Sequence, residues 1–182
     1  MGFLKALFVI LCTLAGYYIG KSIDSKEDIR DILDKILPPG SRWGVPFLSR
    51  KIAREQAFKI LFAIDVGNNT VEEASEIVIE FLKDENQKSF IQSEVKGVLN
   101  NLTNIDKVIN KYSDDWTIDR MASTDRNILR LAVYEIIYSQ DIPMSVSINE
   151  AVEIAKKYGD EQSYKFINGL LGSIAKDYSS KQ

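Results

Sequence analysis

The chain has 182 residues, of which 45% are hydrophobic and 27% are charged, and its formal net charge is −3. This composition is typical of a folded globular protein with one domain of ordinary size. The sequence contains no histidine and one cysteine, which excludes Ser-His-Asp and Cys-His catalytic centres, zinc sites with histidine ligands and an intramolecular disulfide. A pI near 5.2 argues against a generally basic nucleic-acid-binding protein but allows a local basic patch.

The N-terminus carries an uncharged apolar run from Ala6 to Gly20, with one lysine on each side. Residues 3–23 approach the length of roughly 20 residues that a helix needs to cross a bilayer core of ~30 Å. We interpret residues 1–23 as a candidate transmembrane helix and expect membrane association through residues 3–23. A cleaved signal peptide and a buried soluble helix are the alternatives that this pattern leaves open.

Residues 24–48 are interpreted as an amphipathic helix followed by a tether. Apolar residues at helical spacing between Ile29 and Ile36 predict the helix, which extends to residue 37. The Pro-Pro-Gly sequence that follows stops any helix. The composition changes near Ser49, where we place the domain boundary.

Residues 49–182 predict an all-α domain. Their apolar side chains recur at spacings of three or four, and no alternating strand pattern occurs. The first helical segment closes at Gly67. Thr70 and Glu73 then have the spacing of a capping box, which predicts the start of the second helix.

Four more helices are expected in the rest of this domain. Residues 90–112 predict one long helix, because their apolar spacing is continuous. The helix that starts near Thr124 is apolar on nearly all sides and is therefore expected at the centre of the bundle. Ser147 and Glu150 predict a second capping box, and residues 164–175 predict the last helix.

No signature of an enzyme is present. The sequence lacks a P-loop, a glycine-rich dinucleotide loop and a nucleophile elbow. Acidic pairs such as Glu72-Glu73 are more typical of solvated helix faces and caps than of acid-base pairs. We therefore expect no catalytic residue, no metal ligand and no cofactor.

A basic cluster formed by Arg50, Lys51 and Arg54 opens the first helix of the domain. Cations at this end oppose the positive end of the helix dipole, so the cluster breaks a local rule. Such a cluster can bind the phosphates of a nucleic acid. An ordinary charged surface and attraction to anionic lipid are the alternatives.

Six stretches together carry a family resemblance. They are AREQA at 53–57, WTIDRMA at 116–122, TDRNILRLAVYE at 124–135, IP at 142–143, SINEAVEIAK at 147–156 and KFINGLL at 165–171. In order and spacing these stretches resemble the NusB transcription antitermination family over the whole of residues 49–182. Any one stretch alone is weak evidence, whereas the ordered set is specific.

The resemblance implies a NusB-like bundle of about seven helices in two subdomains. It also implies binding of boxA RNA in nascent ribosomal RNA leaders, together with the ribosomal protein NusE. The resulting heterodimer joins the RNA polymerase elongation complex and suppresses premature termination. Members of the family act by binding and not by catalysis.

The resemblance also implies site residues. The RNA-binding positions are Arg50, Lys51, Arg54, Phe62, Lys165, Phe166 and Asn168. Asp125 falls on an acidic position that faces NusE, and Arg126 and Arg130 flank either partner. From the residues alone, Phe166 suits either stacking on an unpaired base or plain core packing.

The first 48 residues depart from the family pattern and resemble a small integral membrane protein segment. If they form an anchor, the NusB-like domain must lie in the cytoplasm, tethered to the inner face of the membrane. A gene fusion or a mis-assigned start codon would equally account for this extension, and an adaptor that keeps the fold but recruits another protein is the alternative function. Residues 49–182 hold 17 basic and 21 acidic residues, a net charge of −4, so RNA binding requires a local basic patch.

Overall fold

The computed structural model describes residues 45–79, 82, 84–113, 116–139 and 141–179. The chain divides into two compact units, Met1–Gly44 and Val45–Gln182, and the second is described here. The candidate transmembrane helix at 1–23 and the amphipathic helix at 24–37 lie outside the described residues. Within the described ranges, no helix combines the length and the apolar character that a membrane span requires.

The domain is built entirely from helices. In the described part of the chain these are α3 (Val45–Gly67), α4 (Val71–Ile79), α5 (Glu85–Asn100), α6 (Leu102–Tyr112), η1 (Ile118–Arg120), α7 (Ser123–Tyr138), α8 (Met144–Tyr158) and α9 (Ser163–Ser179). Seven of these elements are α-helices and η1 is a short 3-10 turn. The expected all-α fold with about seven helices is thus confirmed.

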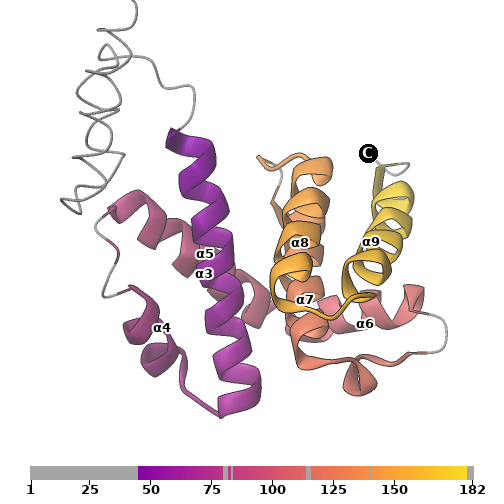
Figure 1. The fold of residues 1–182 in the computed structure, drawn as a ribbon, viewed down its shortest axis with the longest axis horizontal. Helices are drawn as coiled ribbons and strands as arrows, with labels where there is room; N and C mark the ends of the chain where they lie inside the picture. The colour runs from indigo at the N-terminus through magenta and orange to yellow at the C-terminus, as the bar shows by residue number, and fades with distance from the viewer. Residues whose placement is uncertain (1–44, 80–81, 83, 114–115, 140, 180–182) are drawn as a thin grey trace, which may run out of the picture. The chain divides into compact units, whose positions relative to one another are not determined.

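Helix α7 occupies the centre of the domain, as its apolar circumference predicts. It packs against α3 and α5 on one side and against α6, α8 and α9 on the other. Figure 1 shows α3, α4 and α5 in the left part of the domain and the remaining helices in the right part. Buried residues of α7, among them Ile128, Leu129 and Val133, belong to the core that joins the two groups.

The first predicted capping box is confirmed at the start of α4. The backbone N–H of Thr70 donates to Oε2 of Glu73 at 2.8 Å, and the backbone N–H of Glu73 donates to Oγ1 of Thr70 at 3.2 Å. Both groups would otherwise lack a partner inside the helix. Helix α3 begins at Val45, four residues before the boundary expected at Ser49.

The single long helix expected over residues 90–112 is wrong, because the chain breaks at Asn101 between α5 and α6. Asn101 has φ −112° and ψ 10°, outside the helical range. Its side-chain Nδ2 donates to the carbonyl oxygen of Gly97 at 2.8 Å. The asparagine side chain thereby satisfies a carbonyl at the end of α5 and lets the chain turn.

The second capping box is also wrong. Helix α8 begins at Met144 with Pro143 as its N-cap, so Ser147 and Glu150 lie inside the helix. Both side chains are buried, and Oε2 of Glu150 has no hydrogen-bond partner. The spacing of the two residues matched a cap, whereas the proline four residues before Ser147 sets the actual start.

Candidate nucleic-acid interface

The basic cluster at the start of α3 separates into exposed and buried members. Arg50 is exposed, and its guanidinium carbon lies 4.3 Å from the centroid of the Phe90 ring on α5. Lys51 is half-buried beside α8. Arg54 is only 5% exposed, and its Nε donates to Oε1 of Glu135 at 2.6 Å. Arg54 thus forms an ion pair in the core. Contact between Arg54 and RNA stays a prediction.

Glu94 lies in the same buried region as this ion pair. It is 3% exposed, and its Oε2 has no hydrogen-bond partner. Burial raises the pKa of Glu94 to about 8, and the nearby carboxylate of Glu135 adds to the shift. Burial also raises the pKa of Glu135, against the opposing effect of Arg54. The Arg54–Glu135 pair joins α3 to α7, and all three of these side chains are buried.

Arg126 and Arg130, expected to flank a partner, are both engaged inside the domain. Arg126 donates to Oδ2 of Asp65 through Nη2 at 2.5 Å, and Arg130 donates to Oδ1 of Asp65 at 3.0 Å. Arg130 also makes a two-pronged pair with Asp106, with N–O distances of 2.9 and 2.8 Å. Burial alone would raise the pKa of Asp65, but hydrogen bonds from Arg126, Asn127 and Arg130 lower it. A role of the two arginines in partner binding stays a prediction.

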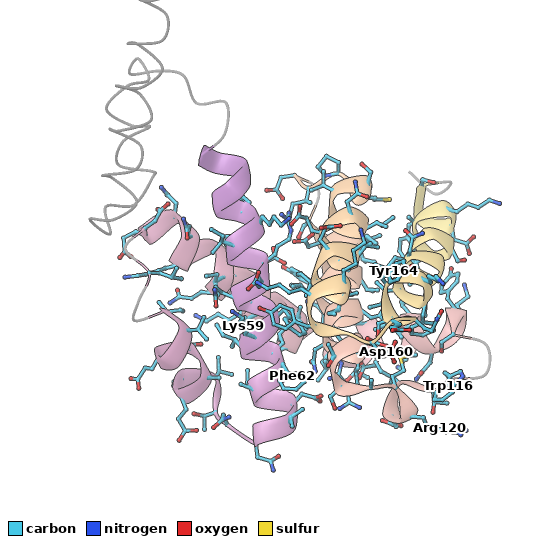
Figure 2. All side chains as sticks on the ribbon, in the orientation of Figure 1. Lys59, Phe62, Trp116, Arg120, Asp160 and Tyr164 are labelled. Atoms are coloured by element: carbon cyan, nitrogen blue, oxygen red, sulfur yellow. The ribbon has the colours of Figure 1, made fainter. Side chains whose placement is uncertain are left out.

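Phe62 lies one turn before Asp65 on α3. It is half-buried and packs against the core, and its ring centroid is 6.1 Å from that of Phe58 at a tilted angle of 48°. Figure 2 shows Phe62 on α3 together with Lys59. Phe62 is thus a partly exposed aromatic that packs on the core, and its contact with RNA stays a prediction.

The second predicted RNA segment lies on the first turns of α9. Lys165 and Asn168 are exposed, whereas Phe166 is half-buried. Phe166 lines a hollow of about 420 Å³ together with Trp116 and Asp125. The structure therefore brings a residue assigned to RNA and a residue assigned to NusE into one hollow.

Asp125 is buried at this hollow, and its Oδ1 has no hydrogen-bond partner. Burial raises the pKa of Asp125. A buried carboxylate oxygen without a partner is costly, and a ligand that donates a hydrogen bond can remove that cost. The hollow is thus suited to a donor group of a protein or a nucleic acid.

Trp116 is a residue of this site to which the sequence analysis gave no role. It is 54% exposed, and the guanidinium of Arg120 lies 5.5 Å from its ring centroid. Figure 2 labels both residues at the lower end of the domain. The sequence could have pointed to Trp116, because it is a large aromatic residue in a polar connecting segment. No helical apolar pattern there explains it as a core residue.

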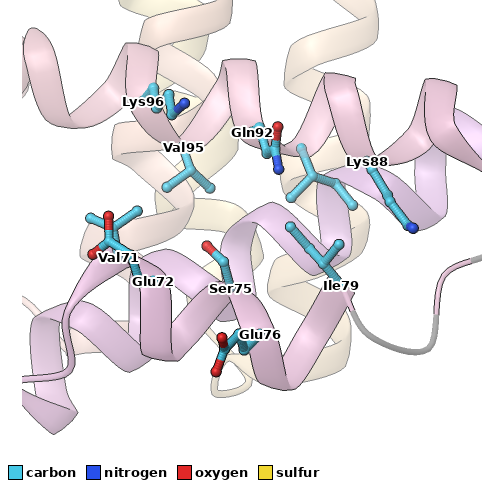
Figure 3. Close-up of a pocket in the computed structure, with 10 residues that line it drawn as sticks. Val71, Glu72, Ser75, Glu76, Ile79, Lys88, Gln92, Val95 and Lys96 are labelled. Carbon is cyan, nitrogen blue, oxygen red and sulfur yellow. The ribbon is translucent and has the colours of Figure 1, made fainter.

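A separate hollow of about 670 Å³ lies between α4 and α5. Figure 3 shows its lining, with Glu72 and Glu76 on α4 and Lys88 and Lys96 on α5. This mixed charge gives no net attraction for a polyanion. Among the residues that the structure describes, no group of His, Cys, Asp and Glu is arranged to hold a metal ion.

Comparisons with known proteins show which proteins this chain is similar to. The NusB protein of Pelotomaculum thermopropionicum is 51% identical over 128 residues, which are 70% of this chain and 89% of that protein. The solved structure of T. maritima NusB is 40% identical, with a TM-score of 0.67, and the match covers 70% of this chain and 91% of that one. A crystal structure of the antitermination factors NusB and NusE with dsRNA is 32% identical, with a TM-score of 0.67 and coverage of 72% and 98%.

Two family models match different parts of the chain. Residues 1–24 are similar to a family described as "Small integral membrane protein (DUF2273)". This similarity agrees in position with the apolar run at the N-terminus. The model of the NusB family matches residues 51–176, more than half of the chain, and the chain therefore belongs to the NusB family.

Proposed function

We propose that this protein is a transcription antitermination factor that binds boxA-type single-stranded RNA together with ribosomal protein NusE. It supports the transcription of ribosomal RNA operons as part of the RNA polymerase elongation complex. The similarity to a structure of NusB and NusE with RNA supports this proposal. The observation that carries it is the hollow lined by Phe166, Trp116 and Asp125, in which Oδ1 of Asp125 has no hydrogen-bond partner.

The chemistry of this surface suits two partners. Phe166 and Trp116 supply aromatic faces on which unpaired bases stack. Exposed cations at Arg50 and Lys165 attract the phosphate backbone. Asp125 accepts a hydrogen bond from NusE, and its burial makes that bond strong. The protein acts by binding, and no reaction step is assigned to it.

The proposal includes a place for this activity. Nascent RNA is made in the cytoplasm, so the NusB domain works there, and residues 3–23 tether it to the inner face of the membrane. The similarity of residues 1–24 to a small integral membrane protein family supports the tether. The alternative function is a membrane-anchored adaptor that keeps the fold and recruits another protein.

A gel-shift titration of the full-length chain in mild detergent tests the proposal. The chain is titrated against boxA RNA and against a scrambled RNA of equal length, with and without NusE. We expect preferential binding of boxA RNA that NusE strengthens. Phe166→Ala should weaken binding by about fivefold or more, because stacking of one base contributes about 1–3 kcal/mol.

Phe166→Tyr is the matched control, since it keeps an aromatic face and should bind nearly as well. Asp125→Asn should reduce the strengthening by NusE while leaving the binding of RNA alone unchanged. Equal affinity for boxA and scrambled RNA, with no effect of NusE, contradicts the proposed function and favours the adaptor.

A further inference from the structure

Three lysines line a third hollow, on the face where α3 and α8 pack together. Lys51 comes from α3, and Lys156 and Lys157 come from the last turn of α8. With Glu55, Glu153 and Ile154 they line a space of about 380 Å³. We name the three lysines the lysine cradle. The hollow is open to solvent and has room for a hydrated phosphate group.

Glu55 holds one wall of the lysine cradle in place. Its Oε1 accepts hydrogen bonds from Oη of Tyr158 at 2.7 Å and from Nζ of Lys157 at 2.9 Å, and Lys59 pairs with it at 3.2 Å. Burial alone would raise the pKa of Glu55, but the hydrogen bonds from Tyr158, Lys157 and Lys59 lower it to about 2. Glu55 is therefore ionised at any working pH. Its carboxylate on α3 holds the ammonium group of Lys157 on α8 in place.

The lining of three lysines and two glutamates leaves a surplus of one positive charge. Lys51 makes no ion pair within 4.0 Å with any residue that the structure describes, although its charge helps to lower the pKa of Glu153. Lys156 pairs with Glu153 at 2.7 Å, but the two side chains are 51% and 47% exposed. An ion pair this exposed contributes little free energy, so a phosphate can replace Glu153 as the partner of Lys156. The lysine cradle therefore offers two cations for phosphate binding besides Lys157.

The helix dipole accounts for only part of this arrangement. Cations in the last turn of α8 are favourable because the dipole ends there in negative charge. That argument explains Lys156 and Lys157, but not why Lys51 of another helix lines the same hollow. Lys51 follows Arg50 in the chain, but the Arg50 guanidinium lies over Phe90 of α5 whereas Lys51 lines the hollow beside α8, so the lysine cradle is a separate basic site on the same turn of α3.

We propose that the lysine cradle binds backbone phosphates of the same single-stranded RNA and carries its path from α3 onto the end of α8. This inference rests on the proposed function and adds Lys156 and Lys157 to the RNA-binding residues. Because the contacts are to phosphate, they contribute affinity without sequence preference. An anionic lipid surface is the competing ligand, and the experiment below separates the two.

The test compares two double variants of the full-length chain in mild detergent. Lys156→Gln/Lys157→Gln removes two cations of the lysine cradle, and Lys96→Gln/Lys107→Gln removes two exposed lysines on α5 and α6. Affinity for boxA and for scrambled RNA is measured over a series of salt concentrations. The side chains of Lys156 and Lys157 are 51% and 59% exposed, so the variant should fold, and a thermal melt checks this.

For single strands, the slope of log affinity against log salt falls by about 0.7 for each phosphate contact that is lost. We therefore expect a slope shallower by about 1.4 for the cradle variant, equally for both RNAs, and an unchanged slope for the control variant.

An unchanged slope in the cradle variant, with normal wild-type binding, overturns this inference and leaves the proposed function standing. An equally reduced slope in the control variant also overturns this inference and leaves the proposed function standing. Binding to vesicles of phosphatidylcholine and phosphatidylserine is measured separately, after removal of the detergent. A cradle variant that keeps its RNA affinity and loses only its binding to these vesicles also overturns the inference, in favour of lipid. Wild-type protein that binds neither RNA overturns the proposed function itself, and this inference with it.

Discussion

Replacing Glu94 by glutamine should stabilise the domain at alkaline pH. The carboxyl group is buried in α5, and the charged groups that face it are Glu135 and Asp141, which are acidic, and Arg54 and Arg50, which are basic. Burial and Glu135 raise its pKa from 4.5 to about 8, in spite of Arg54. Glutamine keeps the size and the polar atoms of the side chain but cannot acquire the charge.

The sign follows from proton linkage. The unfolded chain releases the proton of Glu94 near pH 4.5, whereas the folded chain keeps it up to about pH 8. Between these values the folded state binds more protons, so the free energy of unfolding falls as the pH rises. With these two pKa values, the loss between about pH 5.5 and about pH 8.5 is about 3 kcal/mol.

Urea denaturation of the wild-type chain and Glu94→Gln at these two pH values measures the effect. The difference in unfolding free energy between variant and wild type should shift by about 3 kcal/mol in favour of the variant at the higher pH. Titration of groups far from Glu94 acts on both proteins and cancels in this comparison, whereas Glu135 interacts with Glu94 directly and contributes to the measured difference.

A difference that stays constant between the two pH values refutes the reasoning. It would mean that Glu94 has an ordinary pKa in the folded state, through a partner or water that satisfies its Oε2. A shift in the opposite direction would mean that the carboxylate is charged and paired in the native domain.

Two further substitutions test packing and buried charge. Asp65→Ala should cost about 3 kcal/mol by urea denaturation, since it leaves the guanidinium groups of Arg126 and Arg130 partly unpaired. Glu85, which is 83% exposed and pairs with Lys88, is the control, and Glu85→Ala should cost less than about 1 kcal/mol. Equal costs would contradict the assigned network. In the Gly97→Ala variant, the added Cβ would overlap the ring of Tyr134. The substitution should therefore destabilise the wild-type chain but gain about 1 kcal/mol of helix propensity in a Tyr134→Ala background, and a gain in both backgrounds would show that the Tyr134 ring moves freely.

The fold class followed from the sequence because apolar spacing reports directly on which face of a helix is buried. The central place of α7 and the capping box at Thr70 were predictable for this reason. The break at Asn101 was not, because it depends on a single side-chain hydrogen bond to Gly97. A continuous apolar pattern cannot distinguish one long helix from two helices that turn at such a residue.

The candidate site was less predictable, because the role of a charged residue depends on a partner far away in the sequence. Arg54 looked like a member of a surface cluster until its pairing with Glu135, 81 residues away, placed it in the core. Lys157 looked like an ordinary helix end, and only its contact with Glu55, 102 residues away, places it beside Lys51. Tertiary pairing of this kind leaves no periodic trace in the sequence.

The arginines and the lysines of this acidic domain have different roles, which explains how the domain can bind RNA. The domain from residue 45 onward has five arginines, and Arg54, Arg126 and Arg130 are engaged with carboxylates inside it. Guanidinium groups suit such ion pairs because they stay charged and bond in two directions. Phosphate contacts are then left mainly to lysines and Arg50, so few cations face the RNA. A modest salt dependence and a need for aromatic stacking and a protein partner follow from this shortage.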